Sequence, residues 1–566
     1  MRAWRLPPFG VETIALFVSL YFTLASNQMV WQRVFADLSW VEARTWVYVA
    51  GLGIALTALQ FVFVVPVLTR RTVRPLLALL IVATAFATYF MQKYSVFLDP
   101  AMLRNALHTD AKEAAELFSW DLLPHLVWQA LLPVIVLWIL PLADHSWRRA
   151  VLQRVGAIVA ALVVFALALL IIFQDAAALA RNHRELRFMV TPGNYVYALA
   201  KLGRGSADGV AKPLTPIGSD VAFGSSWAER SKPVLLVIVV GETARAANWG
   251  LNGYARQTTP ELAQLDVVNF RNVQSCGTDT EVSLPCMFSA WGRRDHDESR
   301  IRTHESLLHV LDRAHMRVLW RDNQSGCKGV CKGLELQQLS ASKVPGICAG
   351  GRCFDEILLH GLDTEVRAAK ASQVVVLHQL GSHGPAYFSR YPPAFRRFTP
   401  TCDTGELRKC SPEQIVNAYD NSLLYTDHML AETIRFLQSR QSTHDTALLY
   451  VSDHGESLGE HNLYLHGMPW AIAPREQTQV PMLMWFSPGF EASFGVETGC
   501  LRERATLPAS HDHLFHTVLG MLDLHTAIYD GAFDLTKPCR TAPQSAQQQP
   551  RPLSFKSAPA APRRGA

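Results

Sequence analysis

Five long apolar stretches occupy most of the first 175 residues of this 566-residue chain. They run near residues 9–31, 46–68, 75–92, 122–142 and 152–173. Each is long enough to cross roughly 30 Å of hydrocarbon as a helix. A soluble protein would have to bury five such helices one after another, so the sequence predicts a five-helix transmembrane domain over residues 1–175.

Arginine residues gather in alternate connections of this membrane part. They precede the first stretch and lie between the second and third and between the fourth and fifth, at Arg2, Arg5, Arg70, Arg71, Arg74, Arg148, Arg149 and Arg154. Because connections rich in Lys and Arg stay in the cytoplasm, we predict a cytoplasmic N-terminus. An odd number of spans then places the rest of the chain outside, as in a multi-pass protein of a bacterial inner membrane with a periplasmic domain.

All ten cysteines lie after the apolar stretches, and eight form closely spaced pairs: Cys276/Cys286, Cys327/Cys331, Cys348/Cys353 and Cys402/Cys410, with Cys500 and Cys539 left over. An even number of cysteines in local pairs favours disulfides in an oxidising compartment. Zinc knuckles at the second and third pairs are the alternative, which the predicted topology disfavours.

The remaining chain divides by composition. An outer-face helical segment over 93–120 joins the third and fourth spans, and Asn105, Thr109 and Glu113 would share one face of a helix there. We predict a linker at 176–230, a catalytic domain at 231–540 and a disordered tail at 541–566, rich in Pro, Ala, Gln and Arg. The net charge of +5 forms no basic stripe, so no nucleic-acid partner is expected.

Short apolar or β-branched runs alternate with amphipathic stretches in the second half of the chain. The expected strands are Pro233–Val240, Val267–Val273, Met316–Trp320, Gln373–His378, Thr446–Val451 and Val480–Phe486. This alternation is typical of an α/β domain with a mainly parallel sheet and helices on both faces. Ligands of such folds bind beyond the carboxyl ends of the strands.

Acidic, histidine and hydroxyl side chains follow four of these strands. Glu242 follows the first, and Asp453 and His454 follow the fifth. Carboxylate and imidazole are zinc ligands, and a bound metal makes a nearby hydroxyl a usable nucleophile. Residues 275–283, which follow the second strand, offer three such hydroxyls: Thr278, Thr280 and Ser283. His383 follows the fourth strand, and His466 lies further along the chain.

These motifs and the five spans together resemble the phosphoethanolamine transferases that modify lipid A, a family that includes the transmissible colistin-resistance enzymes and belongs to the alkaline phosphatase/sulfatase superfamily. The resemblance covers the chain to about residue 540. It rests on Gly241-Glu242-Thr243, Cys276-Gly277-Thr278-Asp279-Thr280, Pro285-Cys286-Met287-Phe288 and Ser452-Asp453-His454-Gly455-Glu456-Ser457-Leu458-Gly459-Glu460.

The resemblance implies roles for individual residues. Thr280 is the implied nucleophile, and the implied zinc ligands are Glu242, Thr280, Asp453 and His454. His383 and His466 are implied as contacts to substrate or to a second zinc. The implied substrate-binding residues are Asn105, Thr109, Glu113, Ser325 and Lys328. The family's disulfides also add Cys500–Cys539 as a fifth pair.

The reaction implied is transfer of phosphoethanolamine from phosphatidylethanolamine to lipid A through a phospho-threonine. The enzyme would contact membrane lipids and act as a monomer, and the product would lower outer-membrane negative charge and give polymyxin and colistin resistance. A core heptose or another periplasmic glycan is an alternative acceptor. A lipoteichoic-acid-type glycerophosphate transferase, a sulfatase and a non-catalytic receptor are further interpretations. The cysteine-rich outer domain disfavours the glycerophosphate transferase, and the lack of a C/S-x-P-x-R motif disfavours the sulfatase. The intact metal-site residues disfavour the non-catalytic receptor.

Overall fold

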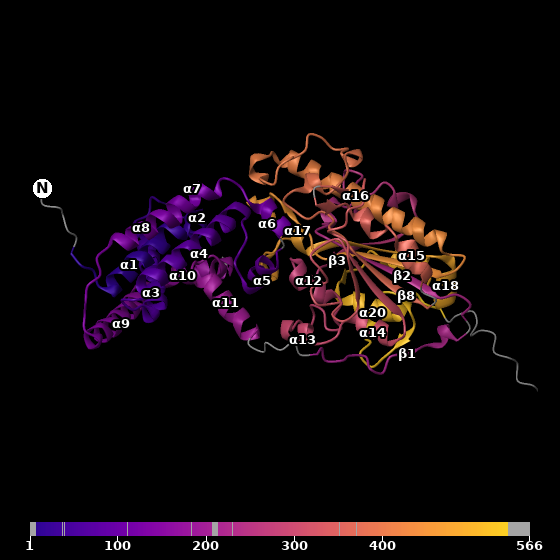
Figure 1. Ribbon diagram of the computed structural model, residues 1–566, viewed down its shortest axis with the longest axis horizontal. Helices are drawn as coiled ribbons and strands as arrows, with labels where there is room; N and C mark the ends of the chain where they lie inside the picture. The colour runs from indigo at the N-terminus through magenta and orange to yellow at the C-terminus, as the bar shows by residue number, and fades with distance from the viewer. Residues whose placement is uncertain are drawn as a thin grey trace, which may run out of the picture.

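The computed structural model describes residues 7–36, 38, 40–109, 111–182, 184–206, 213–228, 230–349, 351–368 and 371–541. The predicted tail, apart from its first residue, lies outside these ranges. A helical membrane part is followed by an α/β domain (Figure 1).

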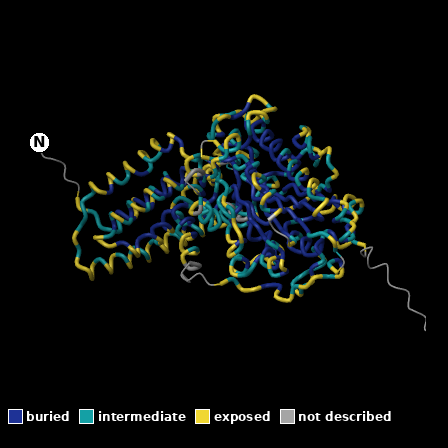
Figure 2. The backbone as a smooth tube through the Cα atoms, turned by 45° about the vertical axis from the view of Figure 1, so that its right-hand side comes forward, coloured by how far each residue is buried: buried dark blue, intermediate teal, exposed yellow. Residues whose placement is uncertain are grey.

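Four helical segments in the described ranges are long and apolar enough to cross a membrane: Ala43–Val67, Val73–Tyr94, Leu122–Ile139 and Trp147–Ile171. A fifth candidate is the pair Val11–Ser26 and Gln28–Phe35, which is bent by 55°. The prediction of five spans therefore holds if this bent pair counts as one. Many large apolar residues of these helices are exposed, as lipid contact requires. Figure 2 shows exposed residues along the whole membrane part.

The α/β domain contains an eight-stranded sheet with the order β13-β3-β12-β9-β2-β8-β4-β5. Its strands are β2 (Val234–Gly241), β3 (Val268–Gln274), β4 (Arg317–Asp322), β5 (Glu335–Gln338), β8 (Gln373–His378), β9 (Asp445–Ser452), β12 (Gln479–Phe486) and β13 (Ala509–Ser510). All six predicted strands are confirmed. Only β12 runs against its neighbours, so the sheet is mainly parallel.

Alternate side chains of β2 enter two different cores. Leu236 and Ile238 pack beneath α12 (Thr280–Met287), α14 (Leu307–Arg313) and α20 (Asp512–Met521), whereas Val237 packs beneath α15 (Leu362–Ala368) and α16 (Pro412–Ser439). Figure 1 shows α16 on one side of the sheet and α14 and α20 on the other. Both faces are thus covered, as continuous apolar strands predict.

Five disulfides join all ten cysteines in the predicted pairs, including Cys500–Cys539. No free cysteine remains. The zinc-knuckle alternative is therefore wrong.

The outer-face segment differs from a single continuous helix. Helix α5 (Pro100–His108) begins after Asp99, whose side chain accepts a hydrogen bond from Met102 N at 2.8 Å. It ends before Thr109, which is extended, and α6 (Ala111–Leu117) follows. The Thr109 hydroxyl donates to the Asn105 carbonyl at 2.9 Å, a local bond that competes with continuation of the helix. The expected single face of residues 105, 109 and 113 on one helix is therefore wrong.

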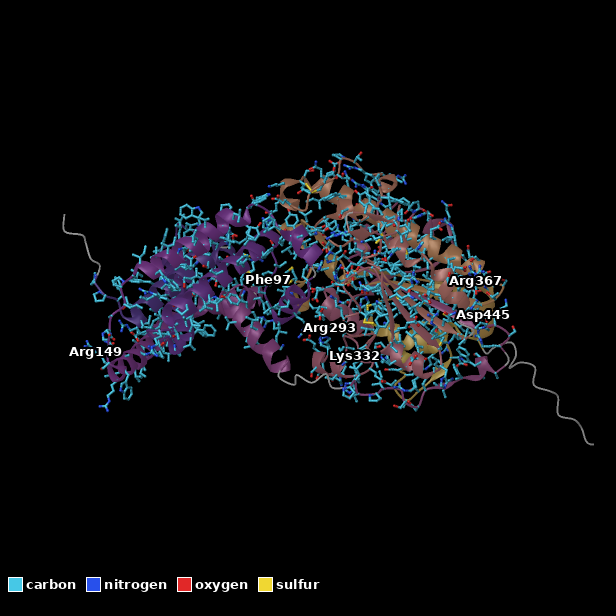
Figure 3. The ribbon with its side chains drawn as sticks, in the orientation of Figure 1. Phe97, Arg149, Arg293, Lys332, Arg367 and Asp445 are labelled. Atoms are coloured by element: carbon cyan, nitrogen blue, oxygen red, sulfur yellow. A yellow bond between two sulfur atoms is a disulfide. The ribbon has the colours of Figure 1, made fainter. Side chains whose placement is uncertain are left out.

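This segment packs on the α/β domain. Helix α5 contacts α12, and Met102 lies against Gly467, where an added Cβ would come within 2.1 Å of its Cε. Phe97 packs with Met468 in a shared cluster, and Figure 3 shows Phe97 near the junction of the two parts. In the same view Arg149 lies at the end of the membrane part farthest from the α/β domain.

Candidate active site

The ends of neighbouring parallel strands lie level with one another. Gly241 at the end of β2 pairs with Ser452 of β9, and His378 at the end of β8 pairs with Val240 of β2. The residues that come next, including Glu242 and Asp453, are therefore delivered to the same edge of the sheet.

Glu242, Asp453 and His454 converge at this edge. Their ligand atoms lie within 4.8 Å of one another, and all three residues are buried. His454 Nε2 is 3.5 Å from Glu242 Oε1 and 3.3 Å from Asp453 Oδ2. The close backbone approach behind them requires glycine at Gly381, where a Cβ would lie 2.6 Å from the Glu242 carbonyl oxygen and φ is +52°.

The chemistry of this cluster suits a cation such as zinc. Burial raises the pKa of Asp453, and Asp453 Oδ2 is buried without a hydrogen bond among the described residues. Burial also lowers the pKa of His454 well below its usual range, which favours the neutral ring. His454 Nδ1 lies 2.9 Å from the Gly455 carbonyl; a donor at Nδ1 leaves the Nε2 lone pair facing the carboxylates, as metal ligation requires.

Thr280 is the hydroxyl residue placed against this cluster. Its Oγ1 donates to Glu242 Oε2 at 3.0 Å and lies 3.4 Å from His454 Nε2. It is the first residue of α12, and Asp279 caps that helix by accepting from Val282 N at 3.0 Å. The Cys276–Cys286 disulfide ties the two sides of this turn together.

The two other candidate hydroxyls are engaged elsewhere. Thr278 donates to the Met468 carbonyl at 2.6 Å, and Ser283 donates to the Asp453 carbonyl. Both bonds are buried and hold loops in place. The geometry thus favours Thr280 among the three hydroxyls that the sequence offered.

His383 and His466 lie next to one another, and His466 is also next to His454. Their ring centroids are 5.6 Å apart, and those of His454 and His466 are 4.4 Å apart. His466 Nδ1 is 2.8 Å from Glu456 Oε2. Burial alone would lower the pKa of His466, but the neighbouring Glu456 carboxylate raises it.

Lys328 and Ser325 form a small basic site beside Thr280. Lys328 Nζ donates to Ser325 Oγ at 2.8 Å and lies 3.7 Å from Glu281 Oε2. Glu281 directly follows Thr280, and Lys328 is largely buried. The Lys328 ammonium therefore places a positive charge next to the start of α12.

Of the three substrate-binding residues predicted in the membrane part, neither of the two with described side chains makes a hydrogen bond to the acid–histidine cluster. Helix α5, which carries Asn105, contacts α12, and Thr109 follows that helix. The side chain of Glu113 lies outside the described residues.

Several neighbours of the site were not predicted from the sequence. Gln324, in the loop after β4, donates to Glu242 Oε2. His378 Nδ1 lies 2.8 Å from Asp322 Oδ2, and both are fully buried. His511 contacts the loop before α12, where its Nδ1 accepts a hydrogen bond from Cys276 N at 3.0 Å. Burial lowers the pKa of His511 to about 4. The sequence signal that could have identified Asp322, Gln324 and His378 is their position at or just after the end of a strand.

Known proteins resemble both parts of the chain. Residues 235–524 match the sulfatase family, and residues 56–206 match the family described as phosphoethanolamine transferase EptA/EptB. Phosphoethanolamine transferase EptA of Escherichia coli K12 is 41% identical over 470 residues, which cover 82% of this chain and 86% of that protein. Phosphatidylethanolamine transferase Mcr-1 of Escherichia coli is 36% identical over 521 residues, which cover 89% of this chain and 95% of that protein.

A full-length solved structure is also similar. It is the integral membrane protein lipooligosaccharide phosphoethanolamine transferase A (EptA) from Neisseria meningitidis, with a TM-score of 0.88 and 36% sequence identity. The match covers 95% of this chain and 100% of that one.

The sheet and the buried acid–histidine cluster at its edge define an enzyme of the alkaline phosphatase/sulfatase type. Its membrane part makes it an integral membrane protein. The chain belongs to the phosphoethanolamine transferase family, so its activity is transfer of phosphoethanolamine.

Proposed function

We propose that the enzyme transfers phosphoethanolamine from phosphatidylethanolamine to lipid A, with zinc as cofactor and a phospho-threonine at Thr280 as intermediate. The observation that carries this proposal is the position of Thr280 Oγ1, 3.0 Å from Glu242 Oε2 and 3.4 Å from His454 Nε2. A hydroxyl in that position is the nucleophile that a metal-dependent phosphoryl transfer needs.

Glu242, Asp453, His454 and the Thr280 hydroxyl are the residues that would hold zinc. When bound, zinc would lower the pKa of the Thr280 hydroxyl and offset charge on the phosphoryl oxygens. The support is the donor set itself, two carboxylates and an imidazole buried together.

In the first half-reaction, Thr280 Oγ1 forms a bond to the phosphorus of phosphatidylethanolamine while the bond from phosphorus to the diacylglycerol oxygen breaks. The hydroxyl proton leaves toward Glu242, to which it already points. His383 or His466 supplies the proton that the released diacylglycerol takes up. Lys328 holds the phosphate as a point charge.

In the second half-reaction, a phosphate of lipid A attacks the phospho-threonine. The new bond to phosphorus forms as the bond to Thr280 Oγ1 breaks, and Thr280 takes its proton back from Glu242. The attacking phosphate gives up its hydroxyl proton to the histidine that protonated diacylglycerol, which restores the starting state. The ethanolamine group carries a positive charge, so the modified lipid A is less negative and binds cationic peptides such as polymyxin and colistin less well.

Both substrates are lipids, which accounts for the membrane part. We place the N-terminus in the cytoplasm and the α/β domain in the periplasm, and we assign Asn105, Thr109, Glu113 and Ser325 to substrate binding. The support is the arginine distribution, the five disulfides and the contact of α5 with α12.

Mass spectrometry of lipid A and core sugars from cells expressing the enzyme tests the proposal. We expect phosphoethanolamine on a lipid A phosphate, and none in cells expressing Thr280→Ala. Phosphoethanolamine on a core heptose alone would contradict the acceptor, and a glycerophosphate adduct would contradict the donor.

A further inference from the structure

One buried arginine connects the active-site loop to the membrane part. Arg390 follows the short helix Tyr387–Ser389, and its side chain is 1% exposed. Its Nε donates to the His383 carbonyl at 2.6 Å, and its Nη2 donates to Glu116 Oε2 at 2.5 Å. Glu116 belongs to α6 of the outer-face segment, so a single side chain bridges elements that lie far apart in the sequence.

The loop that Arg390 holds, residues 383–390, contains His383 and supports the second active-site histidine, His466, from a distance. Tyr387 in the same loop donates to Glu456 Oε1 at 2.5 Å, and the other oxygen of Glu456 holds His466 at 2.8 Å. The loop is packed closely, because a Cβ on Gly384 would lie 2.8 Å from the Glu456 carboxylate. A displacement of the loop would therefore move His383 and strain the support of His466.

Glu116 is itself fixed from two sides. Its other carboxylate oxygen pairs with Arg352, which belongs to the hairpin of β6 (Cys348–Ala349) and β7 (Arg352–Cys353) and not to the His383 loop. Glu116 is largely buried between these two arginines. The Glu116 carboxylate thus anchors α6 to the α/β domain through two arginines, and one of them, Arg390, also bonds to the His383 carbonyl.

We propose that Arg390 is a positioning residue, which holds His383 in its active position while α6 is docked through Glu116. The planar guanidinium is suited to this task, because its rigid fork makes both bonds at fixed angles; a lysine could not make them together. The inference rests on the role of His383 in the proposed function.

Steady-state kinetics of the full-length enzyme in vesicles containing phosphatidylethanolamine and lipid A provide the test. We expect kcat to fall about 100-fold for Arg390→Met, because misplacement of a catalytic group by about 1 Å costs this much. Arg390→Lys and Glu116→Gln should each lower kcat about tenfold with KM for phosphatidylethanolamine unchanged. The matched control is Arg352→Met, which removes the other arginine paired with Glu116, in the β6–β7 hairpin, and should retain kcat.

A double-mutant cycle with His383→Ala separates positioning from general destabilisation. If Arg390 acts mainly through His383, Arg390→Met should cause a much smaller loss of kcat in the His383→Ala background. The remaining loss should be no more than the part that reaches His466 through Tyr387 and Glu456. The same 100-fold loss in both backgrounds would overturn the proposal, as would wild-type kcat for Arg390→Lys and Glu116→Gln. These two milder changes keep the test valid if Arg390→Met does not fold.

The two proposals fail in different ways. A wild-type rate for His383→Ala alone would refute the role of His383 in the proposed function, and the positioning role with it. A reduced rate for His383→Ala together with undiminished Arg390 variants would refute only the positioning role.

Discussion

Three hydroxyl residues within six positions of one another differ in what their oxygens contact. Thr278 and Ser283 donate to backbone carbonyls, and such bonds fix loops. Thr280 donates to a carboxylate of the acid–histidine cluster. A nucleophile must be free to leave its resting hydrogen bond as the new bond forms, so the contacts of Thr280 alone suit attack on phosphorus.

Thr280→Ala should therefore abolish transfer while leaving the fold and most of the bound zinc, since three ligands remain. The measurements are transfer to lipid A, the melting temperature and metal content of the purified protein. Ser283→Ala is the matched control: it should lower the melting temperature, because it removes a buried hydrogen bond worth about 1 kcal/mol, and it should retain measurable transfer. Equal loss of transfer in both variants would contradict the assignment.

His428 offers a test of charge outside the acid–histidine cluster. Its Nδ1 lies 2.7 Å from Glu261 Oε1 and its Nε2 lies 3.5 Å from Glu356 Oε1. Hydrogen bonding to Glu356, followed by that to Glu261, raises the pKa of His428 to about 9. Because the pKa in the folded state exceeds the value of about 6.5 in an unfolded chain, the protonated ring stabilises the fold fully below about pH 6.5. This stability is lost as the pH rises through about 9.

His428→Gln should accordingly lower the melting temperature most at low pH. For an interaction worth about 1 kcal/mol we expect a difference from wild type of roughly 2–4 °C at pH 6, shrinking to near zero by about pH 10. Thermal denaturation followed across this range is the measurement. A difference that stays constant with pH would show that the ion pairs do not carry the effect.

At the scale of elements, α12 depends on a covalent tie. The Cys276–Cys286 disulfide spans a separation of 10 residues that includes the start of α12 and Thr280. Cys500–Cys539 spans 39 residues and joins α19 (Thr498–Arg504) to the helical turn Lys537–Cys539. The longer loop constrains the unfolded chain more, by about 4 kcal/mol against about 3 kcal/mol.

Removing each disulfide with paired serines should therefore separate stability from activity. Cys500→Ser/Cys539→Ser should lower the melting temperature more and leave kcat nearly unchanged. Cys276→Ser/Cys286→Ser should lower it less but reduce kcat at least tenfold, because Thr280 loses its fixed orientation. Thermal denaturation and transfer assays on both variants are the measurements. A larger loss of kcat in the variant with the lower melting temperature would contradict this prediction.

Much of the α/β domain follows from local sequence. Runs such as Gln373–His378 are apolar and bounded by polar loops, and such runs form buried parallel strands. Position after a strand then identified Glu242, Asp453 and His454, because the carboxyl ends of these strands share one edge. The same argument, applied to the end of β4, would have found Asp322 and Gln324.

Other features depend on tertiary contacts that the sequence does not encode locally. The break between α5 and α6 arises where Thr109 bonds back to Asn105, and spacing alone predicts an unbroken helix. Arg390 follows no strand, and its role appears only when Glu116 and the His383 carbonyl are seen around it. The resemblance to a known family supplied the choice of Thr280, which chemistry alone left open.

At the scale of the whole molecule, the two parts meet around the outer-face segment. Arg104 of α5 pairs with Glu298 of α13 (Glu298–Thr303), and Arg408 donates to the Lys93 carbonyl at 2.8 Å. These contacts and the Glu116–Arg390 pair lie at one end of the membrane part. Arg149 marks the other end (Figure 3). The arginine-rich connections should therefore lie on the opposite side of the membrane from the active site.

Single introduced cysteines test this topology, because all ten native cysteines are in disulfides. Arg71→Cys should resist a membrane-impermeant maleimide in cells with a permeabilised outer membrane and react after lysis. Trp120→Cys, at an exposed site of the outer-face segment, should react in both cases. Labelling of Arg71→Cys before lysis would reverse the proposed orientation.

The central claim, a phospho-threonine at Thr280, is tested most directly by peptide mass spectrometry. The purified zinc-loaded enzyme would be incubated with phosphatidylethanolamine and no acceptor, quenched, and digested. We predict a phosphoethanolamine adduct on Thr280, which disappears when lipid A is added. An adduct on Thr278 or Ser283, or transfer to lipid A without any adduct on the enzyme, would contradict the account.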